Sequence, residues 1–230
     1  RHGNHYMRKN EEPVTPKGHA TDIFTQWAAD YIGEQAKTER PFFLYLAYNA
    51  PHTPIQPPAD WLAKVVKREQ GIDGRRAKLV ALIEHMDDGI GKVLSALRSN
   101  GQAKNTLVIF TSDNGPVDRT RGYRARWVKG DTAIYGHDSN GPVRGWKAGL
   151  QEGGHRVPFV VRWPGVIPAG TSSDAMATSM DLLPTLAKFA GTKPPGDRKI
   201  DGKDIASLLL AKPGAATPHK AFYFYSRGQL

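Results

Sequence analysis

Apolar residues recur at helical spacing in two stretches of the chain. The first follows Thr21, a candidate N-cap, and predicts a helix to about Gln35. The second runs from about Arg75 to Arg98, and Asn100-Gly101 can cap its end. We assign its apolar positions to the core and place His85 beside the apolar stripe, not among ligands. The periodic positions are Ile23, Phe24, Trp27, Tyr31 and Ile32 in the first stretch, and Leu79, Leu82, Ile83, Met86, Ile90, Val93, Leu94 and Leu97 in the second.

Continuous apolar runs of strand length occupy residues 42–48, 106–112 and 157–163. A helix followed by a strand, repeated along the chain, predicts an α/β fold with a mostly parallel sheet flanked by helices. Towards the end, shorter patterns predict a helix capped by Asp181, a second helix capped by Asp204, and a strand beginning near residue 221.

Two segments lack regular patterning. Residues 1–20 are polar and contain Pro13, Pro16 and Gly18, so we expect a loop or a severed connection. Residues 117–156 are rich in Arg, Gly, Trp and Tyr. A loop of that length is usually functional or disordered, and its aromatic residues favour a functional loop.

Charge and composition exclude several classes of function for this chain. The 230 residues carry a formal net charge of +10, which favours an anionic partner. The basic residues are dispersed and form no nucleic-acid motif, so we expect no nucleic-acid partner. The absence of Cys excludes disulfides and a thiolate nucleophile within the chain. No membrane span is expected, because no window approaches the length of apolar sequence that a span requires.

Candidate chemistry gathers where two predicted strands end. Asp113 and Asn114 follow residues 106–112, and His52 follows residues 42–48. If both strands belong to one parallel sheet, these side chains face the same crevice. Carboxylate and amide oxygens suit Ca²⁺ or Mg²⁺, although Asp113 and Asn114 can also be turn formers only. Lys147 lies among glycines, and a cation, an imidazole and a lysine together suit sulfuryl or phosphoryl transfer.

Several motifs, in order, resemble those of the sulfatase family, most closely arylsulfatases and N-acetylgalactosamine-6-sulfatases. The resemblance implies the alkaline phosphatase-like fold, incomplete at the amino terminus of this chain. It divides the chain into the carboxyl-side part of the catalytic domain over residues 21–212 and the start of a small subdomain over 213–230. The motifs are Pro51-His52-Thr53-Pro54, Phe110 to Gly115, Gly145-Trp146-Lys147, Glu152 to Pro158, Arg162 to Gly165 and Phe222 to Tyr225.

The resemblance also implies roles for individual residues. Asp113 and Asn114 would bind Ca²⁺, which is expected ahead of Mg²⁺, and Asp113 could also activate the nucleophile. His52 would bind the sulfate and assist the leaving group, and Lys147 would contact the sulfate. Asn140 and Arg144 are expected to support the lysine and to contact substrate. Glu152, Gly153 and Gly154 are assigned to backbone geometry, and Arg156 to a structural pair with a carboxylate.

The family's formylglycine nucleophile arises from a Cys/Ser-x-Pro/Ala-x-Arg motif that this chain lacks. We therefore expect an internal to carboxyl-side part of a sulfatase, inactive alone, whose whole protein hydrolyses an aryl sulfate or a sulfated glycan. A phosphodiester or phosphonate hydrolase of the same group, or a non-catalytic anion- or glycan-binding protein, are alternatives. Resemblance alone suggests a periplasmic or secreted location.

Overall fold

The computed structural model describes residues 7–117 and 141–224, and the chain divides into two compact units. Among the described residues, the first unit contains 7–103 and the second contains 104–117 and 141–224. The expected start of a separate subdomain at residue 213 stays a prediction. No helix in the described ranges combines the length and apolar character needed to cross a bilayer.

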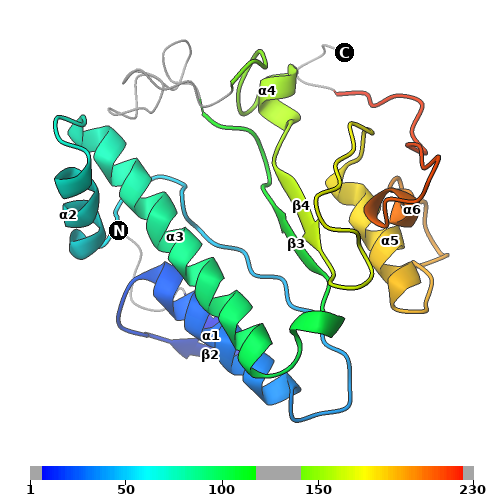
Figure 1. The fold of residues 1–230 in the computed structure, drawn as a ribbon, viewed down its shortest axis with the longest axis horizontal. Helices are drawn as coiled ribbons and strands as arrows, with labels where there is room; N and C mark the ends of the chain where they lie inside the picture. Colours follow the sequence, from blue (N-terminus) through cyan, green and yellow to red (C-terminus); the bar gives the residue numbers. More distant parts are fainter. Residues whose placement is uncertain (1–6, 118–140, 225–230) are drawn as a thin grey trace. The chain divides into compact units, whose positions relative to one another are not determined.

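Three helices build the first unit: α1 (Ala20–Gln35), α2 (Ala59–Arg68) and α3 (Gly74–Ser99). The long α3 packs against both α1 and α2 (Figure 1). Val65 of α2 and two alanines of α3, Ala77 and Ala81, are fully buried at one of these contacts. Small side chains on α3 allow the two helix axes to approach closely. Partly buried apolar residues pack around them, namely Trp61, Leu62, Ile72 and Val80.

The predicted helices are confirmed, with one correction at a helix start. The carboxylate of Asp73 accepts hydrogen bonds from the first backbone N–H groups of α3, and Gly101 follows its end with a φ of 72°. At α1 the N-cap is His19 and not Thr21: its ring nitrogen accepts from the Thr21 N–H. Thr21 is inside the helix and buried. A side-chain acceptor two residues earlier therefore sets the helix start.

Two extended segments of the first unit differ from expectation. Part of the predicted loop forms an antiparallel pair, β1 (Met7–Lys9) with β2 (Glu12–Val14). Residues 42–48 are extended, and their exposure alternates along the chain, but they are not paired in a sheet of the described residues. The segment has the alternating exposure of a strand, but no neighbouring strand in the described residues is hydrogen-bonded to it.

In the second unit, β3 (Val108–Thr111) pairs antiparallel with β4 (Phe159–Arg162), and Val108 lies opposite Arg162. Both strands are thus confirmed, but the expectation that they are buried is wrong, because Phe110, Phe159 and Val160 are exposed. The mostly parallel arrangement is not seen locally: each strand pair in the described residues is antiparallel. Alternation and apolar content cannot fix strand direction, because both directions bury apolar side chains.

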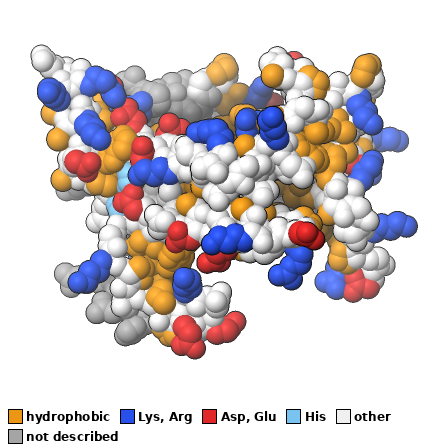
Figure 2. Space-filling model, turned by 60° about the horizontal axis from the view of Figure 1, so that its bottom comes forward, with side chains coloured by type: hydrophobic (Ala, Val, Ile, Leu, Met, Phe, Trp, Pro, Cys, Tyr) orange, Lys and Arg blue, Asp and Glu red, His pale blue; other side chains and the backbone are white. Residues whose placement is uncertain are grey.

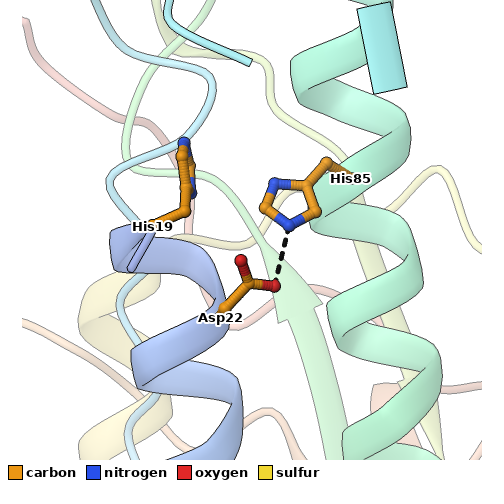
Figure 3. A group of neighbouring side chains, drawn as sticks. All are labelled: His19, Asp22 and His85. Atoms are coloured by element: carbon orange, nitrogen blue, oxygen red, sulfur yellow. Dashed lines mark hydrogen bonds and ion pairs between the residues drawn. The ribbon is translucent and has the colours of Figure 1, made fainter. Parts of the chain in front are cut away.

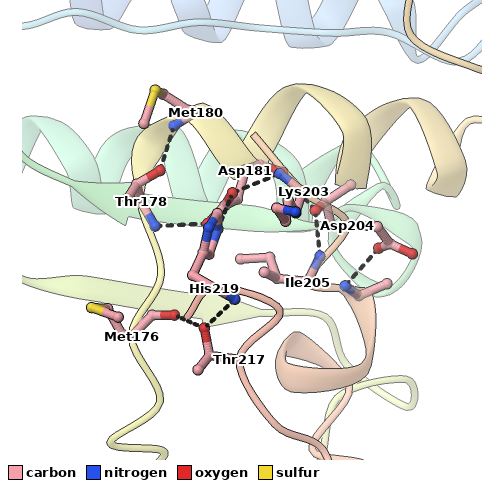
Figure 4. Close-up of polar contacts among 11 residues, drawn as sticks. Met176, Thr178, Met180, Asp181, Lys203, Asp204, Ile205, Thr217 and His219 are labelled. Atoms are coloured by element: carbon pink, nitrogen blue, oxygen red, sulfur yellow. Dashed lines mark hydrogen bonds and ion pairs between the residues drawn. The ribbon is translucent and has the colours of Figure 1, made fainter. Parts of the chain in front are cut away.

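The helices of the second unit are short, and one carboxylate connects the segments around them (Figure 4). Asp181, fully buried, accepts from the Thr178 N–H and the Lys203 N–H at 2.8 and 2.7 Å, and from His219 Nε2 at 2.8 Å. Asp204 accepts from the Ala206 N–H, but the N-cap position of α6 is Ile205 and not Asp204 as predicted. The elements are η1 (Ala103–Asn105), α4 (Glu152–His155), η3 (Ser179–Asp181), α5 (Leu182–Phe189) and α6 (Ala206–Leu209).

The strand predicted from residue 221 is not formed: residues 221–224 have no regular structure, and Tyr225 lies outside the described residues. Helix α2 was not predicted from the sequence. Asp181 is the cap residue of α5 by position, yet its carboxylate bonds to neighbouring segments and makes no side-chain cap with that helix. The Asp181 carboxylate therefore accepts hydrogen bonds from distant segments instead of capping α5.

Candidate functional site

The turn after β3 presents two oxygen-bearing side chains. Asp113 is exposed and Asn114 is half-buried, directly before the buried Gly115. The Asn114 Nδ2 group donates to the Gly115 carbonyl at 3.0 Å, so its Oδ1 is the side-chain atom suited to a cation. The Ser112 hydroxyl donates to the Asn114 carbonyl at 3.2 Å and stabilises the turn. Sequence predicted this position correctly as the end of a strand.

A backbone hydrogen bond ties the segment containing Lys147 to that turn. The Lys147 N–H donates to the Pro116 carbonyl at 2.8 Å, two residues beyond Asn114. The Lys147 side chain is half-buried, and its neighbour Ala148 has a φ of 68°. The structure therefore brings the segments of Asp113, Asn114 and Lys147 together within one unit.

Glycines make this close approach possible. A Cβ atom on Gly115 would lie 1.9 Å from the Gly153 carbonyl oxygen, and one on Gly153 would lie 2.1 Å from the Gly145 carbonyl oxygen. Since real Cβ contacts are never that short, backbone packs on backbone here. The predicted backbone role of Gly153 and Gly154 is confirmed. The N–H of Gly115 also donates to the Gly154 carbonyl at 3.1 Å, which fixes the turn against α4.

The remaining predicted residues of this region have different outcomes. Arg156 pairs with Glu152 at 3.3 Å, which confirms the expected structural pair. Arg144 has an exposed side chain, and its carbonyl accepts from the Gly153 N–H at 2.8 Å; its contact with substrate stays a prediction. Asn140 lies outside the described residues.

His52 belongs to the first unit and lies in an exposed turn between two cis X-Pro bonds. Its Nδ1 lies 2.8 Å from the Thr53 carbonyl oxygen, which can only accept, so Nδ1 carries a proton. Nε2 is then the ring atom available to a ligand. Convergence of His52 with Asp113, Asn114 and Lys147 stays a prediction.

The donor set fits a hard cation in part. Asp113 and Asn114 supply oxygen ligands without nitrogen or sulfur, as Ca²⁺ prefers, but Ca²⁺ takes six to eight oxygens. The described residues of this turn would thus provide a minority of the coordination shell. One further cluster of possible ligands, His19, Asp22 and His85, was missed from the sequence because its members come from two helices far apart in the chain.

The chain belongs to the sulfatase family, since residues 2–192 match that family. It is 36% identical over 210 residues to N-acetylgalactosamine-6-sulfatase of Mus musculus, a match covering 91% of this chain and 36% of the mouse protein. Against an arylsulfatase of Hemicentrotus pulcherrimus the identity is 35%, over 95% of this chain and 35% of the relative. The chain thus spans about a third of the length of these curated relatives.

Solved structures confirm the predicted fold class. The structure described as Ps i-CgsB in complex with k-i-k-neocarrahexaose gives a TM-score of 0.73 at 32% identity, covering 87% of this chain and 40% of that one. A phosphonate monoester hydrolase from Silicibacter pomeroyi gives a TM-score of 0.61 at 19% identity. This match covers 89% of this chain and 43% of the hydrolase chain. The second likeness shows the fold alone.

Proposed function

We propose that the protein containing this chain is a sulfuric ester hydrolase acting on sulfated sugars. The observation that carries the proposal is the tethering of the Lys147 segment to the Asp113-Asn114 turn, in a chain of the sulfatase family. A lysine on a segment that is hydrogen-bonded to a turn with oxygen ligands suits a tetrahedral sulfuryl group, whose oxygens need positive charge around them.

In this proposal, Lys147 binds non-bridging sulfate oxygens through its ammonium group. His52, whose Nδ1–H donates to the Thr53 carbonyl, presents Nε2 to the bridging oxygen. When the sulfur–oxygen ester bond breaks, protonated Nε2 gives its proton to the leaving sugar oxygen, and the electron pair of the broken bond stays on that oxygen. In the same proposal, Asp113 binds the cation and activates the nucleophile, which forms a bond to sulfur as the ester bond breaks.

Two groups outside the described residues complete the proposed site. A Ca²⁺ ion, held on this side by Asp113 and Asn114, would neutralise sulfate charge when bound. The nucleophile would be a formylglycine residue from a segment that this chain does not contain. The periplasmic or secreted location stays a prediction.

A sulfated sugar is favoured over other sulfate esters by the relatives and by charge. One relative is named as an N-acetylgalactosamine-6-sulfatase, and one similar structure is described as a complex with k-i-k-neocarrahexaose. The net charge of +10 would raise the local concentration of polyanionic glycans. On the face shown in Figure 2, Lys and Arg side chains are spread among acidic and apolar ones.

The test compares ester classes and single variants in the protein that contains this chain. We expect turnover of 4-nitrophenyl sulfate and of N-acetylgalactosamine 6-sulfate, and much slower turnover of 4-nitrophenyl phosphate or a phenyl phosphonate. Lys147→Ala and His52→Ala should each lower kcat by about 100-fold or more. Lys199→Ala, which removes an exposed lysine of the second unit, is the control.

Each contrary result has a distinct meaning. Faster hydrolysis of the phosphonate would favour the phosphonate hydrolase alternative. Binding of sulfated sugars without turnover would favour a glycan-binding protein. Unchanged kcat in Lys147→Ala and His52→Ala would refute the assigned roles while leaving the reaction class intact.

A further inference from the structure

The turn that carries His52 is anchored to α1 on both sides, within the first unit. Before the turn, the Tyr48 hydroxyl shares a hydrogen bond of 2.7 Å with the hydroxyl of Thr25, a buried residue of α1. After the turn, the Gln56 carbonyl oxygen lies 3.0 Å from Nε2 of His19, the N-cap residue of α1. The chain between these two anchors is therefore held at both ends by the same helix.

The bonds that His52 makes itself lie within the turn. Its N–H donates to the Asn49 carbonyl at 2.9 Å, and its Nδ1–H donates to the Thr53 carbonyl at 2.8 Å. These bonds orient the imidazole relative to the turn, but they do not fix the turn relative to the rest of the unit. The position of the turn depends on the anchors at Tyr48 and Gln56.

The two ring nitrogens of His19 have separate tasks. Nδ1 accepts from the Thr21 N–H at 3.2 Å, so the ring proton is on Nε2. A carbonyl oxygen can only accept, so Nε2–H donates to Gln56. One nitrogen thus caps α1, and the other ties the end of the His52 turn to the start of that helix.

His85 and Asp22 hold the His19 ring in place (Figure 3). His85 lies midway along α3 and is only 3% exposed; its ring meets the His19 ring edge to face, with centroids 4.8 Å apart. His85 Nε2 donates to Asp22 Oδ1 at 2.8 Å, in the first turn of α1. The His85 ring also contacts Trp61, in the first turn of α2, at 5.7 Å. Three helices therefore fix the imidazole that binds Gln56.

The same three side chains do not fit a bound metal ion. The Asp22 carboxylate accepts from His85 Nε2, whereas the nitrogen without a partner among the described residues is His85 Nδ1, on the other side of the ring. One ion could not bind both that nitrogen and that carboxylate. The contact that the cluster does make, through His19, is with the end of the His52 turn.

We propose that His19 is a positioning residue for His52, supported by His85 and Asp22. The inference rests on the proposed function, in which His52 Nε2 gives a proton to the leaving oxygen of the sulfate ester. Proton transfer requires that nitrogen within hydrogen-bond reach of the oxygen. Because a displacement of about 1 Å can lower a rate by roughly 100-fold, a turn anchored at one end only should protonate the leaving group poorly.

Two substitutions separate the two bonds of His19. His19→Asn keeps an acceptor close to the backbone for the Thr21 N–H, but its shorter side chain does not reach Gln56. His19→Gln extends an amide N–H about as far as Nε2, so it keeps a donor for Gln56 and weakens the cap. Positioning predicts a catalytic loss in His19→Asn that His19→Gln restores, whereas capping alone predicts the greater loss in His19→Gln.

The kinetic test compares two esters in the protein that contains this chain. A sugar alkoxide needs a proton as it leaves, whereas 4-nitrophenolate leaves readily without one. His19→Asn should lower kcat for N-acetylgalactosamine 6-sulfate by about tenfold or more, and kcat for 4-nitrophenyl sulfate by less than about threefold, with little change in KM. His19→Gln should keep kcat within about threefold of the wild type for both esters. His52→Ala should also lose more on the sugar sulfate.

Hydrogen exchange tests the anchor without any substrate. His19→Asn should speed exchange of the backbone N–H groups in residues 49–56 and leave exchange in α5, in the second unit, unchanged. Asp30→Asn, at an exposed position on α1, is the matched control and should behave like the wild type. Leu97→Ala, which opens a cavity in the last turn of α3, controls for general destabilisation: it should lower the Tm and change both rates by one common factor.

The outcomes distinguish this inference from the proposed function. The positioning role is refuted if His19→Asn exchanges like the wild type, or if its kcat falls equally for both esters while His52→Ala still loses more on the sugar sulfate; the proposed function then stands. A loss in His19→Gln as large as that in His19→Asn also refutes it, since capping would be the cause. Equal losses on both esters in His52→Ala would remove the acid role of His52, and the positioning role would fail with it.

Discussion

At the scale of single residues, Asp181 is the position on which the second unit depends most. Its carboxylate is fully buried and receives three donors from three different segments of the chain. Figure 4 shows Thr178, Lys203 and His219 directed towards it. Hydrogen bonds to a charged acceptor are the stronger kind, so burial of this carboxylate is compensated locally.

Replacing Asp181 with Asn should destabilise the second unit strongly. An amide offers one acceptor oxygen and turns an N–H towards groups that are themselves donors, so at least one buried donor loses its partner. We expect a loss of about 2–3 kcal/mol in the free energy of unfolding, measured by urea denaturation. Asp174→Asn, at an exposed position, should change it by less than about 0.5 kcal/mol. Equal stability of the two variants would show that the three-donor network contributes little.

Residue roles were predictable from sequence only where they are local. The positions of Asp113 and Asn114 at a strand end could be predicted because they follow an apolar run directly. The family resemblance led us to expect a carboxylate partner for Arg156, and Glu152 lies one helical turn away. The partner of His85 is Asp22, which lies 63 residues earlier in the chain. Periodicity placed His85 beside the apolar stripe of α3 but could not identify what it would face.

At the scale of secondary-structure elements, α3 is determined by both sequence pattern and close packing. Its Gly89 faces α1, where the Thr25 hydroxyl and the Tyr48 hydroxyl share a hydrogen bond of 2.7 Å. Burial raises the pKa of Tyr48, so the phenol keeps its proton at neutral pH. A Cβ atom on Gly89 would lie 2.6 Å from Thr25 Oγ1 and 3.2 Å from the Tyr48 hydroxyl.

Gly89→Ala should therefore destabilise the protein, against the helix propensity that favours Ala by about 1 kcal/mol. Thr25 is buried and hydrogen-bonded, so it cannot move away cheaply, and overpacking should cost about 1–3 kcal/mol. A Cβ atom on Gly91, on the same helix, would have no heavy atom within 4 Å. Gly91→Ala should therefore stabilise the protein by about 0.5–1 kcal/mol. Thermal unfolding of both variants measures the difference. A rise in Tm for both would mean that the contact at Gly89 relaxes freely.

Elements that are stable through their own sequence were predicted well, and those that need a distant partner were not. Helices α1 and α3 have apolar stripes and caps, which are local signals. Residues 42–48 have the apolar run of a strand, yet a strand also requires a hydrogen-bonded neighbour. The antiparallel direction of β3 and β4 likewise depends on the partner and not on either strand's sequence.

At the scale of the whole molecule, the segment 42–48 exposes large apolar side chains to solvent. Its inner side packs on α1 through a Tyr31–Phe42 ring contact and the Thr25–Tyr48 hydrogen bond. On the other side, Phe43 is 72% exposed and Tyr45 is 81% exposed. Apolar side chains reach the surface elsewhere too (Figure 2). Here they project from one extended segment that pairs with no strand in residues 7–117 and 141–224, and such a segment is a template for strand pairing between molecules.

The 230-residue chain studied alone should therefore bind the dye ANS and self-associate as concentration rises. Phe43→Ser with Tyr45→Ser should reduce both effects, because the substitutions remove apolar area from the unpaired segment without touching its packed side. The control is Val66→Ser with Leu183→Ser, two side chains that are each 50% exposed and lie on helices. Dye fluorescence and light scattering against concentration provide the readout. If the control pair lowers self-association as much as the Phe43 and Tyr45 pair, total exposed apolar area is the cause, and the unpaired backbone of residues 42–48 has no special part in it.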